Sequence, residues 1–310
     1  MSLAFYTADD VQAAVSMKEA ISAMKLAFSS LSNGDAIVPA RINMPIDEFN
    51  AHHLSMPSYL KGEKYFTIKL INVHNDNPAN GRDLINGVIL VMSTKTGECV
   101  ALIDGKSVTA LRTGAASGLA TELLSKNNAS KAVIYGNGVQ AKSQIEAIRC
   151  VRNFESIKVI GRSKKNVELF CAGFDDVVSM GDMNDLPEAD IICTATSASN
   201  PLFDSSHIAK GTHINAVGAH GRTKRELPSE LIQNARVYVD SFISSQSEAG
   251  NLIIPIEHGD YEWNRIECEI GTLINSNTEG RANESDITIF NSVGSAIQDL
   301  VISTIVMEKN

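Results

Sequence analysis

Apolar positions along the first third of the chain change from a helical to a strand-like spacing. From Ser16 to Gly34 they recur every three or four residues, which predicts a helix that begins at a Ser-x-x-Glu capping box and ends at Asn33-Gly34. The apolar runs that follow are short and of strand type, and a turn at Thr96-Gly97 indicates that the last two form a hairpin. The expected extended segments are 38–44, 52–57, 65–71, 87–92 and 99–103.

A helix rich in small residues is predicted over 107–125, and strands then alternate with helices. Residues 131–135 are typical of a buried strand, and 139–151 of the helix that follows it. This alternation predicts a doubly wound parallel sheet. An amphipathic helix over 293–306 is expected to return to the first domain. The further strands are expected at 157–160, 177–178, 191–195, 214–217, 237–239 and 286–290.

Composition narrows the class of protein. A chain of 310 residues favours two domains, and its net charge of −9 argues against a nucleic-acid-binding surface. No apolar run approaches the roughly 18 residues that span a membrane, and the N-terminus has no signal-peptide pattern. The five cysteines form no C-x-x-C pair, which favours reduced thiols in the cytoplasm. Adjacent His52 and His53 would point to opposite faces of a strand, so we expect no metal site.

The strand–turn–helix at 131–151 contains Gly136-Asn-Gly-Val-Gln-Ala141, a Gly-x-Gly-x-x-Ala pattern. In such a turn Gly136 allows a tight reversal, and Gly138 lets the backbone approach a pyrophosphate, whose charge faces the helix N-terminus. The alternative is a tight turn that binds no ligand. The setting favours a dinucleotide site.

The second strand of this unit ends in a basic loop that bears on cofactor choice. An acidic residue there would bind the ribose 2′-hydroxyl of NAD, whereas the chain offers Arg162, Ser163, Lys164 and Lys165. These side chains suit a 2′-phosphate, although a solvated basic loop has the same composition. We expect NADPH, with NADH possible.

Three cations stand among apolar neighbours in the first domain. Arg41 lies in an extended segment, and Lys69 points to the opposite face from Ile68 and Leu70. Arg112, one to two turns into a helix, gains nothing from the helix dipole there. Each either faces an anionic ligand or pairs with an acid or with water, and their positions alone leave both choices open.

Taken in order, these segments resemble the ornithine cyclodeaminase/mu-crystallin family. The resemblance runs almost end to end, and its most specific part joins Thr-Ala-Leu-Arg-Thr-Gly-Ala to the glycine turn. The segments that carry it are Pro39–Arg41, Met56-Pro57, Lys69, Ser107–Ala115, Gly136–Gln140, Asn215–Gly218 and Ser292–Asp299.

The resemblance implies a Rossmann domain, 127–290, inserted into a discontinuous α/β substrate-binding and dimerisation domain, 1–126 and 291–310. It implies a homodimer that binds NAD(P)(H) and acts on small amino or imino acids. Arg41, Lys69 and Arg112 would line the substrate pocket and hold its carboxylate. The positions implied for the cofactor are Arg112, Gly136, Gly138, Val139, Gln140, Arg162, Ser163, Asn166, Thr196, Val217, Ser292 and Gly294.

One departure from the family pattern bears on the reaction. Ornithine cyclodeaminases carry an aspartate where this chain has His220, and a histidine would not pair with the substrate's ammonium group. We therefore expect an NAD(P)H-dependent reductase of a cyclic ketimine carboxylate, Δ1-pyrroline-2-carboxylate or Δ1-piperideine-2-carboxylate, which gives proline or pipecolate. Lys69 or His220 would supply the proton. The alternatives are an alanine or other amino-acid dehydrogenase, an ornithine cyclodeaminase, and a non-enzymatic NADPH-dependent ligand carrier.

Overall fold

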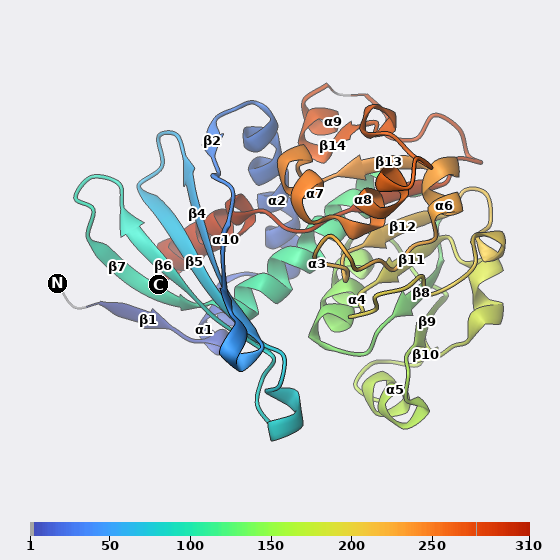
Figure 1. Cartoon of the computed structure of the whole chain (residues 1–310), viewed down its shortest axis with the longest axis horizontal. Coiled ribbons are helices and arrows are strands. Elements are labelled where there is room, and N and C mark those ends of the chain that lie inside the picture. Colours follow the sequence, from blue (N-terminus) through green and yellow to red (C-terminus); the bar gives the residue numbers. More distant parts are fainter. Residues whose placement is uncertain (1–2, 277) are drawn as a thin grey trace. The chain divides into compact units, whose positions relative to one another are not determined.

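The computed structural model describes residues 3–276 and 278–310, which form two compact units (Figure 1). Unit 1 takes the chain up to Arg112 and again from Ser295 onward, and unit 2 takes Thr113 to Gly294. Helix α3 (Gly105–Leu124) runs through the first division, so no single residue marks the boundary there. The boundaries expected at 126/127 and 290/291 stay predictions.

Unit 1 is a seven-stranded sheet with helices on one face. Its main strand order is β1-β7-β6-β5-β4-β2, with β3 also paired to β4, and only the β1–β7 pair is parallel. The hairpin expected across Thr96-Gly97 is present as β6–β7. The elements are β1 (Ala4–Tyr6), α1 (Ala8–Ala14), α2 (Met17–Ser32), β2 (Ala36–Ile37), β3 (Ile42–Ile46), η1 (Asp47–Phe49), β4 (Ala51–Leu60), β5 (Tyr65–His74), η2 (Pro78–Asn80), β6 (Ile85–Ser93), β7 (Cys99–Asp104) and α10 (Ala296–Lys309).

The two faces of this sheet differ in burial. Met56, Lys69, Ile89 and Ile103 form one row across four strands, and all four side chains are buried. Helix α10 packs on this face against β4 and β5 and also contacts α2, as Figure 1 shows. The next row belongs to the opposite face and is only partly buried. It is made of Phe5, Leu102, Leu90, Ile68 and Pro57.

Two predictions for unit 1 need correction. The segment 38–44 was expected to be a strand that includes Arg41, but β3 begins at Ile42. The four residues 38–41, between β2 and β3, lie opposite only three residues of β4, 56–58, so the register shifts and pairing is interrupted there. The last helix was expected from residue 293, but α10 begins at Ala296. Gly294, with a φ of 82°, is in the left-handed region that a helix excludes.

Unit 2 is a doubly wound, all-parallel sheet, as predicted. The strand order is β10-β9-β8-β11-β12-β15-β13-β14, so the direction of winding reverses between β8 and β11. The elements after α3 are β8 (Lys131–Tyr135), α4 (Val139–Val151), β9 (Ser156–Ile160), α5 (Lys164–Cys171), β10 (Val178–Met180), η3 (Met183–Glu188), β11 (Ile191–Thr194), η4 (Ser205–His207), β12 (His213–Ala216), α6 (Ser229–Asn234), β13 (Arg236–Val239), α7 (Phe242–Glu248), α8 (Gly250–Glu257), η5 (Trp263–Arg265), β14 (Cys268–Glu269), α9 (Ile270–Ser276) and β15 (Thr288–Asn291).

The small residues of α3 allow close packing against α4. A Cβ on Gly114 would lie 2.2 Å from Ser143 Oγ of α4, so only glycine allows this approach. Helix α3 is held against the sheet at its other end, where Asn215 Nδ2 donates to Thr121 Oγ1 over 2.9 Å. No helix in the described part of the chain is long and apolar enough to cross a membrane.

Candidate active site

Lys69 lies at the centre of unit 1, where a cation is costly to bury. Its side chain is 1% exposed, and its Nζ is 2.7 Å from Asp299 Oδ2 of α10. Thr109 Oγ1, at 3.4 Å, accepts a further, longer hydrogen bond from the same nitrogen. An ammonium group remains in such an interior only where an opposite charge compensates its lost hydration, and Asp299 supplies that charge.

Arg112 shares the same carboxylate. Its Nε lies 3.5 Å from Asp299 Oδ1, and its Nη1 donates to Gln298 Oε1 over 3.1 Å. Gln298 Oε1 also accepts from the backbone N–H of Ser295 over 2.8 Å, which fixes the amide. Arg112 is therefore oriented by one charged and one neutral acceptor, both at the start of α10.

Electrostatics at Lys69 reflect this crowding of cations. Burial is the largest cause that lowers the pKa of Lys69, to about 8, while Asp299 opposes the shift. Arg112 and Arg41 lower the pKa further through like-charge repulsion, which shows that both guanidinium groups lie within electrostatic reach. Unit 1 thus brings Lys69 and Arg112 to one carboxylate, with Arg41 within electrostatic reach of Lys69.

This cluster has the chemistry of an anion site. Lys69 and Arg112 both face Asp299, and Arg112 and Arg41 repel the Lys69 ammonium, so a substrate carboxylate would reduce the mutual repulsion of the cations. Guanidinium groups suit that task because their paired N–H donors match the two oxygens of a carboxylate. A lysine with a pKa of about 8 also releases a proton more readily than an ordinary lysine.

Asp299 was not among the residues predicted for the site. Its sequence signal was faint: Gln298-Asp299 are two adjacent polar residues in an otherwise apolar stretch. Both side chains are fully buried in the structure. A lysine on the buried face of a strand requires a buried acid as its partner, and Asp299 is that acid.

Unit 2 carries the glycine turn between β8 and α4, and its geometry fits a dinucleotide. Gly136 has a φ of 114°, and a Cβ there would lie 2.5 Å from Ala195 O, so the turn requires glycine. A Cβ on Gly138 would meet nothing within 4 Å, which leaves room above the turn. Gly138 is also the N-cap of α4 and makes no side-chain capping hydrogen bond. These features would hold a pyrophosphate at the helix N-terminus, where the predicted cofactor residues Val139 and Gln140 form the start of α4.

The basic loop lies where the sequence placed it, directly after β9. Gly136 N–H donates to Ile160 O over 2.9 Å, which ties the end of β9 to the glycine turn. Arg162, Ser163 and Asn166 are exposed, and Ser163 caps α5 by accepting from the Asn166 N–H. This loop has no acidic side chain where the ribose of a dinucleotide would lie.

The remaining cofactor candidates follow other strands of the same parallel sheet. Thr196 comes after β11, Val217 after β12, and Ser292 and Gly294 after β15, so all lie at the carboxyl edge. His220 is exposed on the loop after β12. Because Lys69 belongs to unit 1, the two candidate proton donors are carried by different units.

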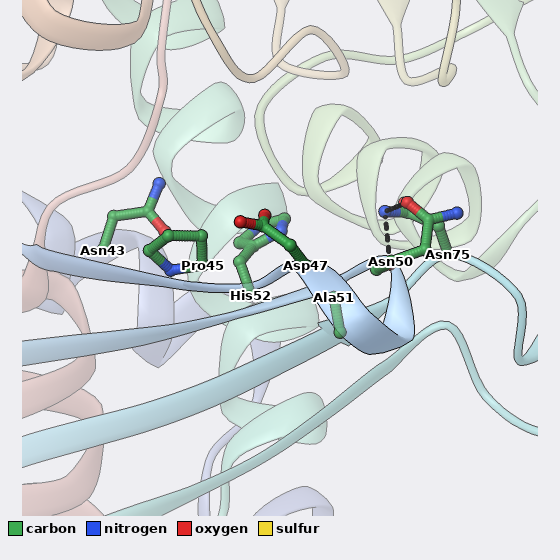
Figure 2. Close-up of a pocket in the computed structure, with 7 residues that line it drawn as sticks. All are labelled: Asn43, Pro45, Asp47, Asn50, Ala51, His52 and Asn75. Carbon is green, nitrogen blue, oxygen red and sulfur yellow. Dashed lines mark hydrogen bonds between the residues drawn. The ribbon is translucent and has the colours of Figure 1, made fainter.

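A separate polar pocket lies in unit 1, around the end of the β3–β4 hairpin. Figure 2 shows Asn43, Asp47 and His52 pointing to the same side of the strands. His52 shares a face with Met56, the cross-strand partner of Lys69, but lies four residues away, about 13 Å along the strand. The pocket is thus distinct from the cation cluster. Among the described residues no group of three or more His, Cys, Asp or Glu side chains could hold a metal ion.

Comparisons with known proteins agree with the geometry. The Delta(1)-pyrroline-2-carboxylate reductase of a Bacillus cereus strain is 35% identical over 310 residues, which cover 98% of this chain and 95% of that protein. The solved structure of the Thermococcus litoralis reductase of the same name, in complex with NADH and L-proline, matches with a TM-score of 0.94 and 35% identity over 99% of this chain and 97% of that one. An archaeal alanine dehydrogenase dimer with bound NAD matches with a TM-score of 0.92 and 30% identity, over 100% and 96%.

The family relationship extends over the whole chain. The model of the ornithine cyclodeaminase/mu-crystallin family matches residues 1–310. Together with relatives at 35% identity over nearly the full length, this match confirms the resemblance predicted from the sequence. The chain belongs to the ornithine cyclodeaminase/mu-crystallin family.

Proposed function

We propose that this protein is an NAD(P)H-dependent reductase that converts a cyclic ketimine carboxylate, Δ1-pyrroline-2-carboxylate or Δ1-piperideine-2-carboxylate, into proline or pipecolate. The observation that carries the proposal is the buried pair of cations, Lys69 and Arg112, that share Asp299, in a chain whose relatives are named Delta(1)-pyrroline-2-carboxylate reductase. A small carboxylate substrate matches this charge.

The roles of the residues in unit 1 follow from their positions. Arg112, held by Asp299 and Gln298, and Arg41 bind the substrate carboxylate. A bound nicotinamide would supply the hydride for the C=N carbon, and the nitrogen then needs a proton from the protein. Lys69 is suited to give it, because its neutral amine is the form that burial favours. A protonated C=N group is also the better hydride acceptor.

One alternative concerns the proton donor, and the others concern the reaction. His220 could take Lys69's role as proton donor, since an imidazole titrates near neutral pH. The similarity to an alanine dehydrogenase keeps reductive amination of pyruvate as the second candidate reaction. Cyclodeamination of ornithine is disfavoured by His220, and a pure ligand carrier by the presence of the whole cation cluster.

Substrate turnover tests the proposal directly. We expect the purified protein to oxidise NADPH or NADH with both cyclic imines, and to have a higher kcat/KM for them than for pyruvate plus ammonia. Release of ammonia from ornithine serves as the cyclodeaminase control. If neither imine is reduced, the proposal is wrong.

The state of Lys69 predicts a dependence on pH. Because burial lowers its pKa from 10.5 to about 8, Lys69 loses its proton as the pH rises through about 8, and kcat/KM for the imine should fall there. Replacement Lys69→Met should reduce kcat by about 100-fold or more.

Lys69→Met alone leaves Asp299 buried without that partner, so the double variant Lys69→Met/Asp299→Asn is the control for folding. NADH binding should persist in both variants, since the cofactor candidates other than Arg112 belong to unit 2. Full reductase activity in either variant would remove Lys69 from the mechanism.

We further propose that the cofactor is NADPH in preference to NADH. The support is the exposed Arg162–Lys165 loop after β9, which has cations where NAD-specific proteins have an acid. The solved relatives contain NADH or NAD, so the preference needs its own test.

Arg162→Asp should weaken NADPH by about tenfold or more, because one charge-assisted contact is replaced by repulsion, while NADH changes little. Dissociation constants from calorimetry give the ratio. Lys158→Asp, on the preceding strand, is the charge-matched control, since Lys158 Nζ donates to Ser179 Oγ of the neighbouring strand. An equal loss for both cofactors would show that the loop does not contact the 2′-phosphate.

We also propose that the protein is a homodimer, and that the partly exposed sheet face of unit 1 is its interface. That face presents a continuous row of apolar side chains, from Phe5, which is 62% exposed, through Leu102, Leu90 and Ile68. Apolar area of this kind is typical of the core of a homodimer interface.

Leu90→Asp should convert the protein from a species of twice 33.4 kDa to one of 33.4 kDa, because a carboxylate would be buried without a partner. Sedimentation velocity measures the mass. Leu26→Asp on α2, where the leucine is 53% exposed, is the matched control and should remain dimeric. A monomeric natural protein, or a dimeric Leu90→Asp variant, would contradict the assignment.

A further inference from the structure

Glu226 is a buried carboxylate of unit 2 that faces only hydrogen-bond donors. Its side chain is inaccessible to solvent. Oε1 accepts from the Thr196 N–H at 2.8 Å and from Thr196 Oγ1 at 2.7 Å. Oε2 accepts from Thr194 Oγ1 at 2.9 Å, from the Gly218 N–H at 2.9 Å and from the Ala219 N–H at 3.1 Å. One side chain thus joins the ends of β11 and β12.

The position of Glu226 is itself fixed. Asn251 Oδ1 of α8 accepts from the Glu226 N–H at 2.8 Å and from the Leu227 N–H at 3.1 Å. Asn251 Nδ2 donates to Asn291 Oδ1, at the end of β15, over 2.9 Å. The segment that carries Glu226 is therefore tied to a third strand of the same edge.

A second buried carboxylate continues this arrangement. Asp240, directly after β13, accepts from Ser292 Oγ at 2.7 Å and from the Gly294 N–H at 2.6 Å. Hydrogen bonds made by three buried side chains, Glu226, Asn251 and Asp240, thus connect the ends of β11, β12, β15 and β13. Together these contacts position Thr196, Val217, Ser292 and Gly294, the cofactor candidates that follow β11, β12 and β15.

All of these contacts lie on one side of the point where the sheet reverses its winding. The glycine turn and the basic loop belong to β8 and β9, whereas Glu226 and Asp240 hold the ends of β11, β12, β15 and β13. In a doubly wound sheet each half binds one mononucleotide of a dinucleotide, and the first βα turn with the second strand takes the adenosine half. The half held by Glu226 is the one left for the nicotinamide.

We propose that Glu226 is a positioning residue for the nicotinamide half of the cofactor, through Thr196 and the Gly218–Ala219 backbone. The inference rests on the proposed use of a nicotinamide cofactor, but not on the identity of the imine. A carboxylate suits these partners because three of the five are backbone N–H groups, which can only donate, and the two threonine hydroxyls donate as well. Whichever way the amide of a glutamine turned, its NH2 group would face at least one backbone N–H donor, which would disturb the Thr196 or the Gly218–Ala219 backbone.

Binding of two probes to Glu226→Gln tests the inference without catalysis. NADH contains both halves of the dinucleotide, and ADP-ribose lacks the nicotinamide ring. We expect Glu226→Gln to bind NADH about tenfold or more weakly, the scale of one misplaced buried hydrogen-bonding group, and to bind ADP-ribose nearly as the natural protein does. Titration calorimetry gives both dissociation constants.

Two further variants sharpen the result. Glu230→Gln, in the first turn of α6, changes an exposed carboxylate in the same segment and should alter neither constant. Thr194→Val removes only one of the five donors and keeps the side-chain shape, so it should weaken NADH selectively but less. It decides the question if Glu226→Gln does not fold.

Unchanged NADH binding in Glu226→Gln, or an equal loss of NADH and ADP-ribose, would overturn the inference. In the latter case Glu226 would support the domain as a whole rather than one half of the cofactor. A protein that shows the selective loss but reduces neither imine would leave this inference intact and contradict the proposed reaction alone.

Discussion

The ion pair between Lys69 and Asp299 is the interaction on which unit 1 depends. It places a buried cation of the central strand against a buried anion of the last helix, and the cost of dehydrating both is offset only while they remain together. Because Asp299 also faces Arg112, the same carboxylate aligns the two cations of the proposed anion site. The packing of α10 onto the sheet therefore also positions Lys69 and Arg112 for the substrate.

The sequence predicted correctly those helices and strands whose boundaries are marked by neighbouring residues, such as caps and glycine turns. Strand 131–135 and helix 139–151 were predicted to the residue, because a buried strand, a glycine turn and a helix start follow one another without interruption. Helix α2 begins and ends where its capping box and Asn33-Gly34 indicated. The strand expected through Arg41 was wrong, since the apolar pattern does not reveal the extra residue that shifts the register against β4 at 38–41.

Contacts between residues far apart in the chain could not be predicted from the sequence. Lys69 could be placed on a strand, but whether it met water, a ligand or an acid depended on Asp299, near the other end of the chain. Glu226 was passed over because a glutamate in a polar loop ordinarily faces solvent. In the structure both acids are buried for different reasons: Asp299 balances cations, whereas Glu226 satisfies neutral donors.

The discontinuity of unit 1 has a consequence for synthesis. All of unit 2 leaves the ribosome before α10 does, so unit 2 has its complete sequence while the sheet of unit 1 still lacks the acid that Lys69 requires. Domains ordinarily complete folding in their order along the chain. Here the unit that emerges first can be completed only after the other, because Asp299 is available to Lys69 only once α10 has left the ribosome.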